Sequence, residues 1–84
     1  MRKTIVKIMT FVKVEVGKSL EVIAQLQKIP EVQQISYITG EYDLMFILAA
    51  DNTETINRKF LEEIDQIPAI FESSSHLIIK EWNH

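Results

Sequence analysis

The chain has 84 residues, of which 46% are hydrophobic and 25% are charged, and it carries a formal net charge of −3 at pH 7. This length allows one domain, and so small a domain is only marginally stable alone, which makes an oligomer a reasonable expectation. The acidic balance and the dispersed basic residues argue against a duplex-binding domain, and the absence of cysteine excludes disulfides and thiolate sites.

Residues 4–16 predict a long first strand, because apolar residues recur at every second position. This apolar parity contains Val6, Ile8, Val12, Val14 and Val16. Ile5, Met9 and Phe11 lie on the other parity, so we expect the centre of the strand to be covered on both faces. Lysines interrupt this apolar segment, and no run in the chain approaches the length of a membrane span, so we expect a soluble cytoplasmic protein without a signal peptide.

Residues 18–29 predict a helix that follows Gly17 and stops before Pro30. Its expected buried stripe is Leu20, Val22, Ile23, Leu26 and Ile29. Residues 32–39 form a more polar strand, as expected at a sheet edge, and Gly40 begins a hairpin turn into a third strand over residues 42–50. Both parities of this third strand are apolar, which predicts a central position buried from both faces.

A second helix is expected after Asp51 and Glu54, which have the spacing of a capping box, and it ends at Pro68. Its predicted buried stripe is Ile56, Phe60, Leu61, Ile64 and Ile67. Weak ion pairs on its solvent side are expected among Arg58, Lys59, Glu62 and Glu63. A last strand is expected from about Ile70 to Trp82.

This order of elements predicts an α+β fold of the ferredoxin-like βαββαβ type, with a four-stranded antiparallel sheet and two helices on one face. The first and third strands are central in that layout, in agreement with their composition. The uncovered sheet face would then expose Ile5, Met9 and Phe11 together with one parity of the third strand. A continuous apolar face marks an association surface, so we expect a homodimer in which two sheets pack face to face.

The candidate chemistry lies in Gly40, Tyr42 and Asp43 at the hairpin and in Ser73 and Ser75 at the start of the last strand. In the simplest interpretation the tyrosine hydroxyl lies in water, Asp43 caps the turn, and the serines belong to a solvated strand start. A carboxylate beside so apolar a strand nevertheless needs a partner. Together the five residues offer the carboxylate, hydroxyls and backbone N–H groups that bind a free amino acid, and the two segments could meet across an oligomer contact.

Other site chemistry finds little support. His76 follows the serines, but no nucleophile-elbow motif is present. His84 is terminal, and two histidines without cysteine lack metal-ligand spacing, so we expect no metal and no cofactor. Two alternatives stay open: a small dimeric enzyme of the monooxygenase or isomerase type, with His76 or Tyr42 as acid or base, and a purely structural assembly partner.

The chain resembles the effector-binding domain of the Lrp/AsnC family of transcription regulators, named RAM for regulation of amino-acid metabolism. The resemblance covers nearly the whole chain and rests on Phe11, Val12 and Val14, on Ile29–Val32, on Thr39–Leu44 and on Pro68–Ser75. The G-x-Y-D hairpin is its most specific part. Ala69 stands where the family usually has glycine, and Ser73 and Ser75 replace two usual threonines, whose hydroxyls they retain.

The resemblance implies a non-catalytic domain that binds a free amino acid between subunits, through Gly40, Tyr42, Asp43, Ser73 and Ser75. It also implies dimers that assemble into higher oligomers. Because the chain begins at the first strand of the domain, we expect residues 1–84 to be a single RAM-type domain without an N-terminal helix-turn-helix. Such a protein would regulate transcription indirectly, through full-length family members, and would not bind nucleic acid or membranes itself.

Overall fold

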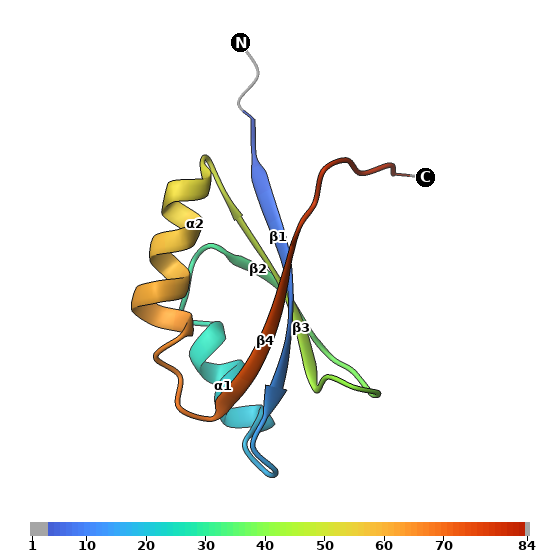
Figure 1. The fold of residues 1–84 in the computed structure, drawn as a ribbon, viewed down its shortest axis with the longest axis vertical. Coiled ribbons are helices and arrows are strands. Elements are labelled where there is room, and N and C mark those ends of the chain that lie inside the picture. The colour runs from blue at the N-terminus through green and yellow to red at the C-terminus, as the bar shows by residue number, and fades with distance from the viewer. Residues whose placement is uncertain (1–3, 84) are drawn as a thin grey trace.

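The computed structural model describes residues 4–83 as an antiparallel sheet with its helices on one face (Figure 1). The elements are β1 (Val6–Val14), α1 (Ser19–Leu26), β2 (Val32–Tyr37), β3 (Leu44–Ala50), α2 (Thr53–Lys59), the π-helical turn η1 (Phe60–Ile64) and β4 (Ile70–Leu77). The four strands are ordered β2-β3-β1-β4, which confirms the predicted ferredoxin-like topology and the central positions of β1 and β3. His84 lies outside the described residues.

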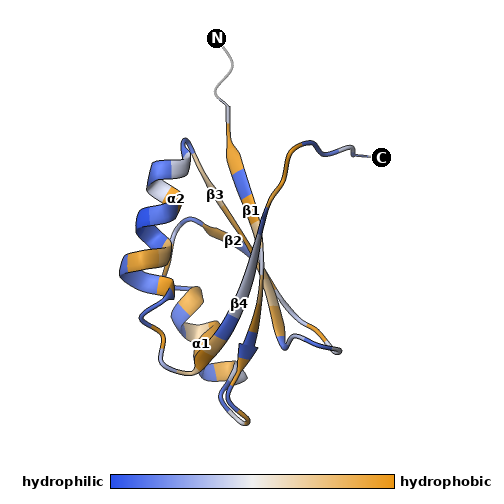
Figure 2. Ribbon diagram, viewed as in Figure 1, coloured by the Kyte–Doolittle hydropathy of each residue, from blue (hydrophilic) through white to orange (hydrophobic). Residues whose placement is uncertain are grey.

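The hydrophobic core fills the space between the sheet and the helices. Val12 of β1 pairs with Leu44 of β3, and Thr10 with Phe46, so alternate residues of both strands point toward the helices. All four are fully buried. The helices contribute Val22, Leu26, Ile56 and Ile64 to the same cluster. In Figure 2 the side of α2 that faces away from the sheet is mostly hydrophilic, as the amphipathic pattern requires.

The opposite face of the sheet, called here the open face, is covered by no helix in residues 4–83. Met9 pairs with Ile47 and Phe11 with Met45, and these four side chains are only partly buried. Ile5 is 49% exposed. The predicted uncovered apolar parity of the two central strands is therefore confirmed. None of the described helices has the length and apolarity that crossing a membrane requires.

Two leucines that the sequence placed in buried stripes are exposed instead. Leu20 is 77% exposed, because the first turn of α1 lies at the end of the sheet beside Gly17 and Tyr37. Leu61 is 67% exposed, because it lies in η1, where the N–H of Asp65 donates to the carbonyl of Phe60 five residues earlier. A π-turn is wider than an α-turn and shifts the side chains that follow it around the helix axis.

Several predicted boundaries also differ from the structure. Asn52, rather than Asp51, caps α2, since its side chain accepts a hydrogen bond from the N–H of Thr55 at 2.7 Å. The first helix ends at Leu26, after which the chain tightens into i to i+3 hydrogen bonds. The last strand ends at Leu77, which pairs with Ile8, and beyond it the N–H of Ile78 donates to the carbonyl of Lys7 at 2.9 Å.

Candidate functional site

The hairpin between β2 and β3 is closed by the N–H of Ile38, which donates to the carbonyl of Asp43 at 3.0 Å. Gly40 lies in this turn with φ +117°, a conformation that a residue with a Cβ rarely adopts. The predicted role of Gly40 in the turn is therefore confirmed. In Figure 1 the hairpin extends away from the two helices, beyond one end of the sheet.

Asp43 continues the pairing of β3 with β1 by both its backbone and its side chain. Its N–H donates to the carbonyl of Val12 at 2.9 Å, and its Oδ2 accepts from the N–H of Val14 at 2.8 Å. The carboxylate of Asp43 therefore has a hydrogen-bond partner, the backbone N–H of Val14, a buried residue that is 6% exposed. Among residues 4–83 the other oxygen, Oδ1, has no hydrogen-bond partner.

Tyr42 lies on the open face of the sheet. Its ring centroid is 5.7 Å from that of Phe11, and the Nζ of Lys13 lies 5.7 Å from the centroid of the Tyr42 ring. On the other side of Phe11, at 5.9 Å, His76 packs edge-on and exchanges a hydrogen bond with Ser74 at 3.0 Å. Phe11 therefore separates Tyr42 from His76, so these two residues do not form a joint acid–base pair.

Ser73 and Ser75 lie on the opposite, helix-facing side of the sheet. In the register of β4 with β1, Ser73 pairs with Val12 and Ser75 with Thr10, whose side chains point toward the helices. The hydroxyls of Ser75 and Thr10 are 3.0 Å apart. Because β1 lies between β3 and β4, it separates the serines from Asp43 within one subunit. The structure thus groups the hairpin residues in one place and the serines in another.

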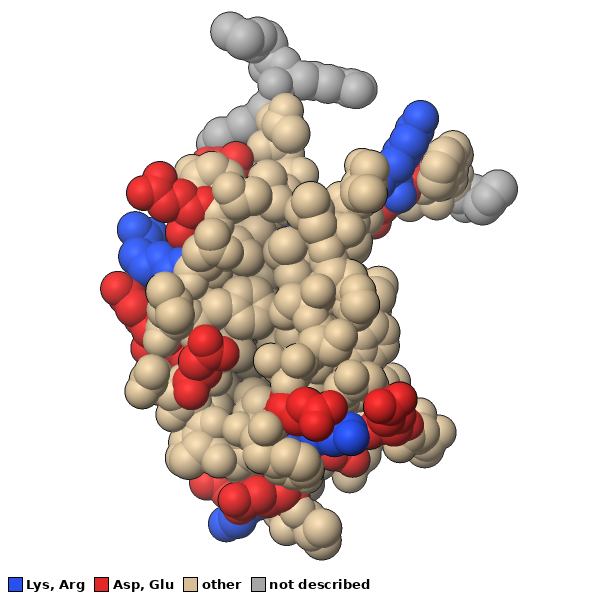
Figure 3. Space-filling model, viewed as in Figure 1, with Lys and Arg blue, Asp and Glu red and all other residues tan. Residues whose placement is uncertain are grey.

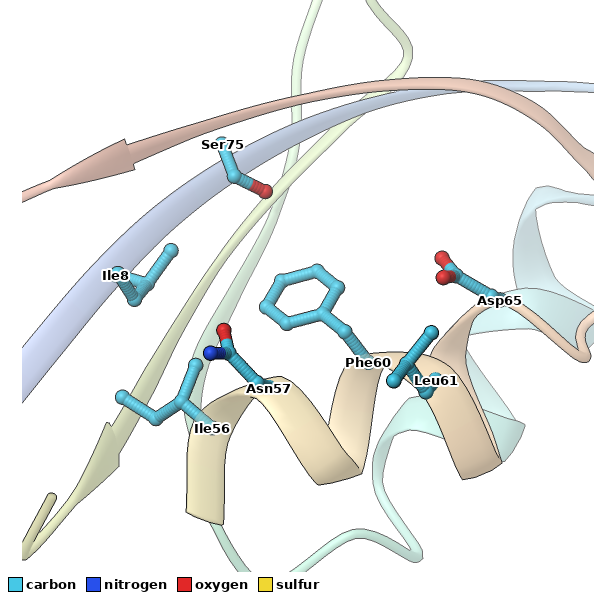
Figure 4. A pocket seen from close by; sticks show the side chains of 7 residues that line it. All are labelled: Ile8, Ile56, Asn57, Phe60, Leu61, Asp65 and Ser75. Carbon is cyan, nitrogen blue, oxygen red and sulfur yellow. The ribbon is translucent and has the colours of Figure 1, made fainter. Parts of the chain in front are cut away.

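Ser75 also borders a cavity of about 460 Å³ between the sheet and the α2–η1 segment (Figure 4). Its lining consists of Ile8, Ile56, Asn57, Phe60, Leu61, Asp65 and Ser75. In Figure 4 the Phe60 ring lies in the middle of this group, with the Ser75 hydroxyl and the Asn57 amide on one side and the Asp65 carboxylate on the other. Neither Asn57, which lies in α2, nor Asp65, which follows η1, was predicted as a site residue, because a polar residue on a helix gives no periodic signal of a nearby cavity.

The charged groups beside the core are structural. Lys59 bonds Glu63 at 2.6 Å, as the helical spacing predicted, and also reaches Glu31 at 3.5 Å. The hydrogen bond that Lys59 donates to Glu63, together with the negative charge of both carboxylates, raises the pKa of Lys59 above its ordinary 10.5 and outweighs the lowering effect of desolvation. Residues 4–83 contain no group of three or more side chains that could hold a metal ion.

On the face shown in Figure 3, acidic side chains lie along the helical side and at the lower end, mixed with a few basic ones. The middle of this face is uncharged. It therefore carries no clustered basic patch of the kind that neutralises nucleic-acid phosphates.

Comparisons with known proteins match this chain to transcriptional regulators. The sequence model of the Lrp/AsnC ligand binding domain matches residues 7–84. The HTH-type transcriptional regulator FL11 of Pyrococcus horikoshii is 35% identical over 69 residues, which are 82% of this chain and 45% of the relative. LysM of Saccharolobus solfataricus, another HTH-type transcriptional regulator, is 32% identical over 62 residues, which are 74% of this chain and 43% of the relative. The chain thus spans less than half the length of these curated relatives.

Solved structures share the fold. The crystal structure of FFRP-DM1 matches with a TM-score of 0.84 and 28% identity, over 88% of this chain and 99% of that one. The transcriptional regulator NMB0573 of Neisseria meningitidis, solved as a complex with L-methionine, matches with a TM-score of 0.83 over 94% of this chain and 53% of that one. At 20% identity the second likeness shows the fold alone.

Proposed function

This chain belongs to the Lrp/AsnC ligand binding domain family, and on that premise we propose that it is a non-catalytic regulatory module that binds a free amino acid between subunits. One observation supports this proposal above the others: the two halves of the candidate site lie on different sides of β1. Asp43 stands at the hairpin, and Ser73 and Ser75 lie on β4 facing the helices. A second subunit would complete each half.

Asp43 is suited to receive the ammonium group of the ligand. The N–H of Val14 holds Oδ2 at 2.8 Å and thereby orients the carboxylate, while Oδ1 stays available. A preoriented carboxylate loses little side-chain freedom when a cation binds. The backbone of Gly40 and the hydroxyl of Tyr42 lie in the same hairpin and would complete the hairpin half of the site.

Ser73 and Ser75 would hold the carboxylate end of the ligand. Both are exposed, and hydroxyls donate hydrogen bonds to carboxylate oxygens. Since β1 separates them from Asp43 of their own subunit, the Asp43 that meets the same ligand would come from a neighbouring copy. Ligand binding would then stabilise the contact between copies, which is how an effector changes the assembly state.

The open face supplies a second contact between copies. Met9, Phe11, Met45 and Ile47 present partly exposed apolar side chains on the two central strands. We assign this face to a homodimer in which two sheets pack together, and the hairpin contacts to the assembly of dimers into a higher oligomer. Burial of such a face also adds stability that so small a domain lacks alone.

Regulation of transcription by this module would be indirect. The curated relatives are HTH-type transcriptional regulators of more than twice its matched length. The module would act in the cytoplasm by mixed assembly with full-length regulators of the family, whose DNA-binding parts contact the operator. NMB0573, which shares the fold, was solved with L-methionine, in accord with an amino-acid effector.

A thermal-shift screen against the twenty amino acids, with oligomeric state measured by sedimentation, tests the proposal. A ligand at one hundred times its dissociation constant should stabilise the protein by about 2.7 kcal/mol and shift its oligomer distribution. The variant Asp43→Asn keeps a hydrogen-bond acceptor for Val14 but loses the charge, and it should lose the response to ligand while remaining folded. An oligomeric protein that responds to no amino acid would instead favour a purely structural assembly partner.

A further inference from the structure

The cavity bordered by Ser75 has features that the amino-acid site described above does not use. We propose that this cavity is the side-chain pocket of that site and that it selects an apolar amino acid. The inference rests on the proposed function, since it places the side chain of the same ligand whose carboxylate Ser75 holds. Its volume of about 460 Å³ falls within the range of about 300–1,000 Å³ that small-molecule sites occupy.

The lining of the cavity leaves apolar surface uncovered. Phe60 is only partly buried and Leu61 is 67% exposed, although both belong to the stripe that should face the core. In Figure 4 their side chains, with that of Ile8, lie around the space below β4. An apolar ligand group placed there removes its own surface and theirs from water, which is favourable in proportion to the area buried.

The π-turn explains how the chain maintains this arrangement. Ile56 before it and Ile64 within it are 2% and 1% exposed, so the segment stays anchored in the core at both ends. The turn closed by the bond from the Asp65 N–H to the Phe60 carbonyl, at 2.7 Å, places Leu61 at the cavity, while Ile64 stays in the core. A π-turn interrupts the regular helical hydrogen bonds and is found frequently at functional sites.

Two polar groups of the lining, those of Ser75 and Asp65, are positioned to interact with the polar atoms of an amino-acid ligand. The Ser75 hydroxyl faces the cavity while it bonds the buried Thr10 hydroxyl at 3.0 Å, so its position is fixed. A ligand whose carboxylate meets Ser75 therefore has the apolar lining within reach of its side chain. The carboxylate of Asp65 stands on the other side of Phe60 and repels acidic side chains.

Calorimetric titration of the full chain with glycine, alanine, valine, leucine, methionine, aspartate and glutamate tests the proposal. Each buried methylene should tighten binding about fourfold, so leucine, with three more carbons, should bind roughly sixtyfold more tightly than alanine. The heat-capacity change should become more negative along the same series. Aspartate and glutamate should bind more weakly than alanine.

Two leucine variants locate the pocket. Leu61→Ala should weaken leucine binding about tenfold and leave alanine binding within about twofold, because only the longer side chain reaches this position. Leu20→Ala is the matched control, since Leu20 is also an exposed helix residue, at 77% against 67% for Leu61, and lies outside the cavity. Both positions are exposed, so both variants should fold, and circular dichroism is the check.

Three results would overturn the inference, and they differ in what they leave standing. Tightest binding of an acidic or other polar amino acid would refute the apolar pocket and preserve the amino-acid function. Leucine binding that Leu61→Ala and Leu20→Ala change equally would place the side chain elsewhere. Binding of no amino acid at all would remove both the pocket and the proposed function.

Discussion

Replacement of Asp43 by alanine, compared with replacement by asparagine, distinguishes the structural role of this residue from its proposed role in ligand binding. The change removes the acceptor of the Val14 N–H, a charge-assisted hydrogen bond of 2.8 Å. Such bonds contribute about 1.5–3 kcal/mol, and the donor, in a residue that is 6% exposed, would be left without a partner. Because Asp43 itself is only partly buried, we expect a loss near the lower end, about 1.5–2 kcal/mol.

The assay is urea denaturation at one fixed protein concentration, because assembly adds to apparent stability. For a domain of this size the loss corresponds to a fall in the melting temperature of about 6–16 °C. Amide exchange of the Val14 N–H should accelerate in the alanine variant. Asp43→Asn, whose amide oxygen can still accept from Val14, should lose no more than about 1 kcal/mol.

Two results would refute this reasoning. A loss below about 0.5 kcal/mol in Asp43→Ala would mean that the hydrogen bond to Val14 does not hold the hairpin against β1. Equal losses in the alanine and asparagine variants would mean that the charge, rather than the acceptor, stabilises the fold. In the second case Asp43→Asn would no longer isolate the ammonium contact.

Further predictions concern the interface, a helix cap, a lysine and the turn. Met45→Asp should dissociate the proposed dimer in sedimentation without loss of the monomer fold, since Met45 lies on the open face outside the core. Asn52→Ala should lower the free energy of unfolding by about 1 kcal/mol in urea denaturation, whereas Asn52→Asp should not. Lys59 contributes stability that is complete below its ordinary pKa of 10.5 and is lost as pH rises through its raised pKa in the fold. Denaturation of the unchanged protein and of Lys59→Met at alkaline pH should isolate that loss, because only the unchanged protein should lose it. If the free energies of unfolding of the two proteins changed in parallel with pH, the prediction would be contradicted. Gly40→Ala should cost about 1–3 kcal/mol because of φ +117°, and an unchanged midpoint would contradict this.

The sequence by itself determined the fold and the family. Alternation in residues 4–16 and the doubly apolar run of residues 42–50 predicted two central strands, and the structure has them as β1 (Val6–Val14) and β3 (Leu44–Ala50). The glycine in the predicted hairpin indicated a turn with a positive φ, which other residues rarely adopt, and Gly40 has φ +117°. These features could be predicted because they depend on residues that are close together in the sequence.

Only the tertiary structure decided how the candidate residues are partnered. The Asp43 carboxylate meets the amide of Val14, 29 positions away, and the Ser75 hydroxyl meets that of Thr10, 65 positions away. Periodicity assigns a side chain to a face, but it does not specify a hydrogen bond between strands that the register brings together. The π-turn that contains Leu61 was likewise not predictable from the sequence. The residues of η1 are compatible with an ordinary α-helix, and no local pattern in them indicates a π-turn.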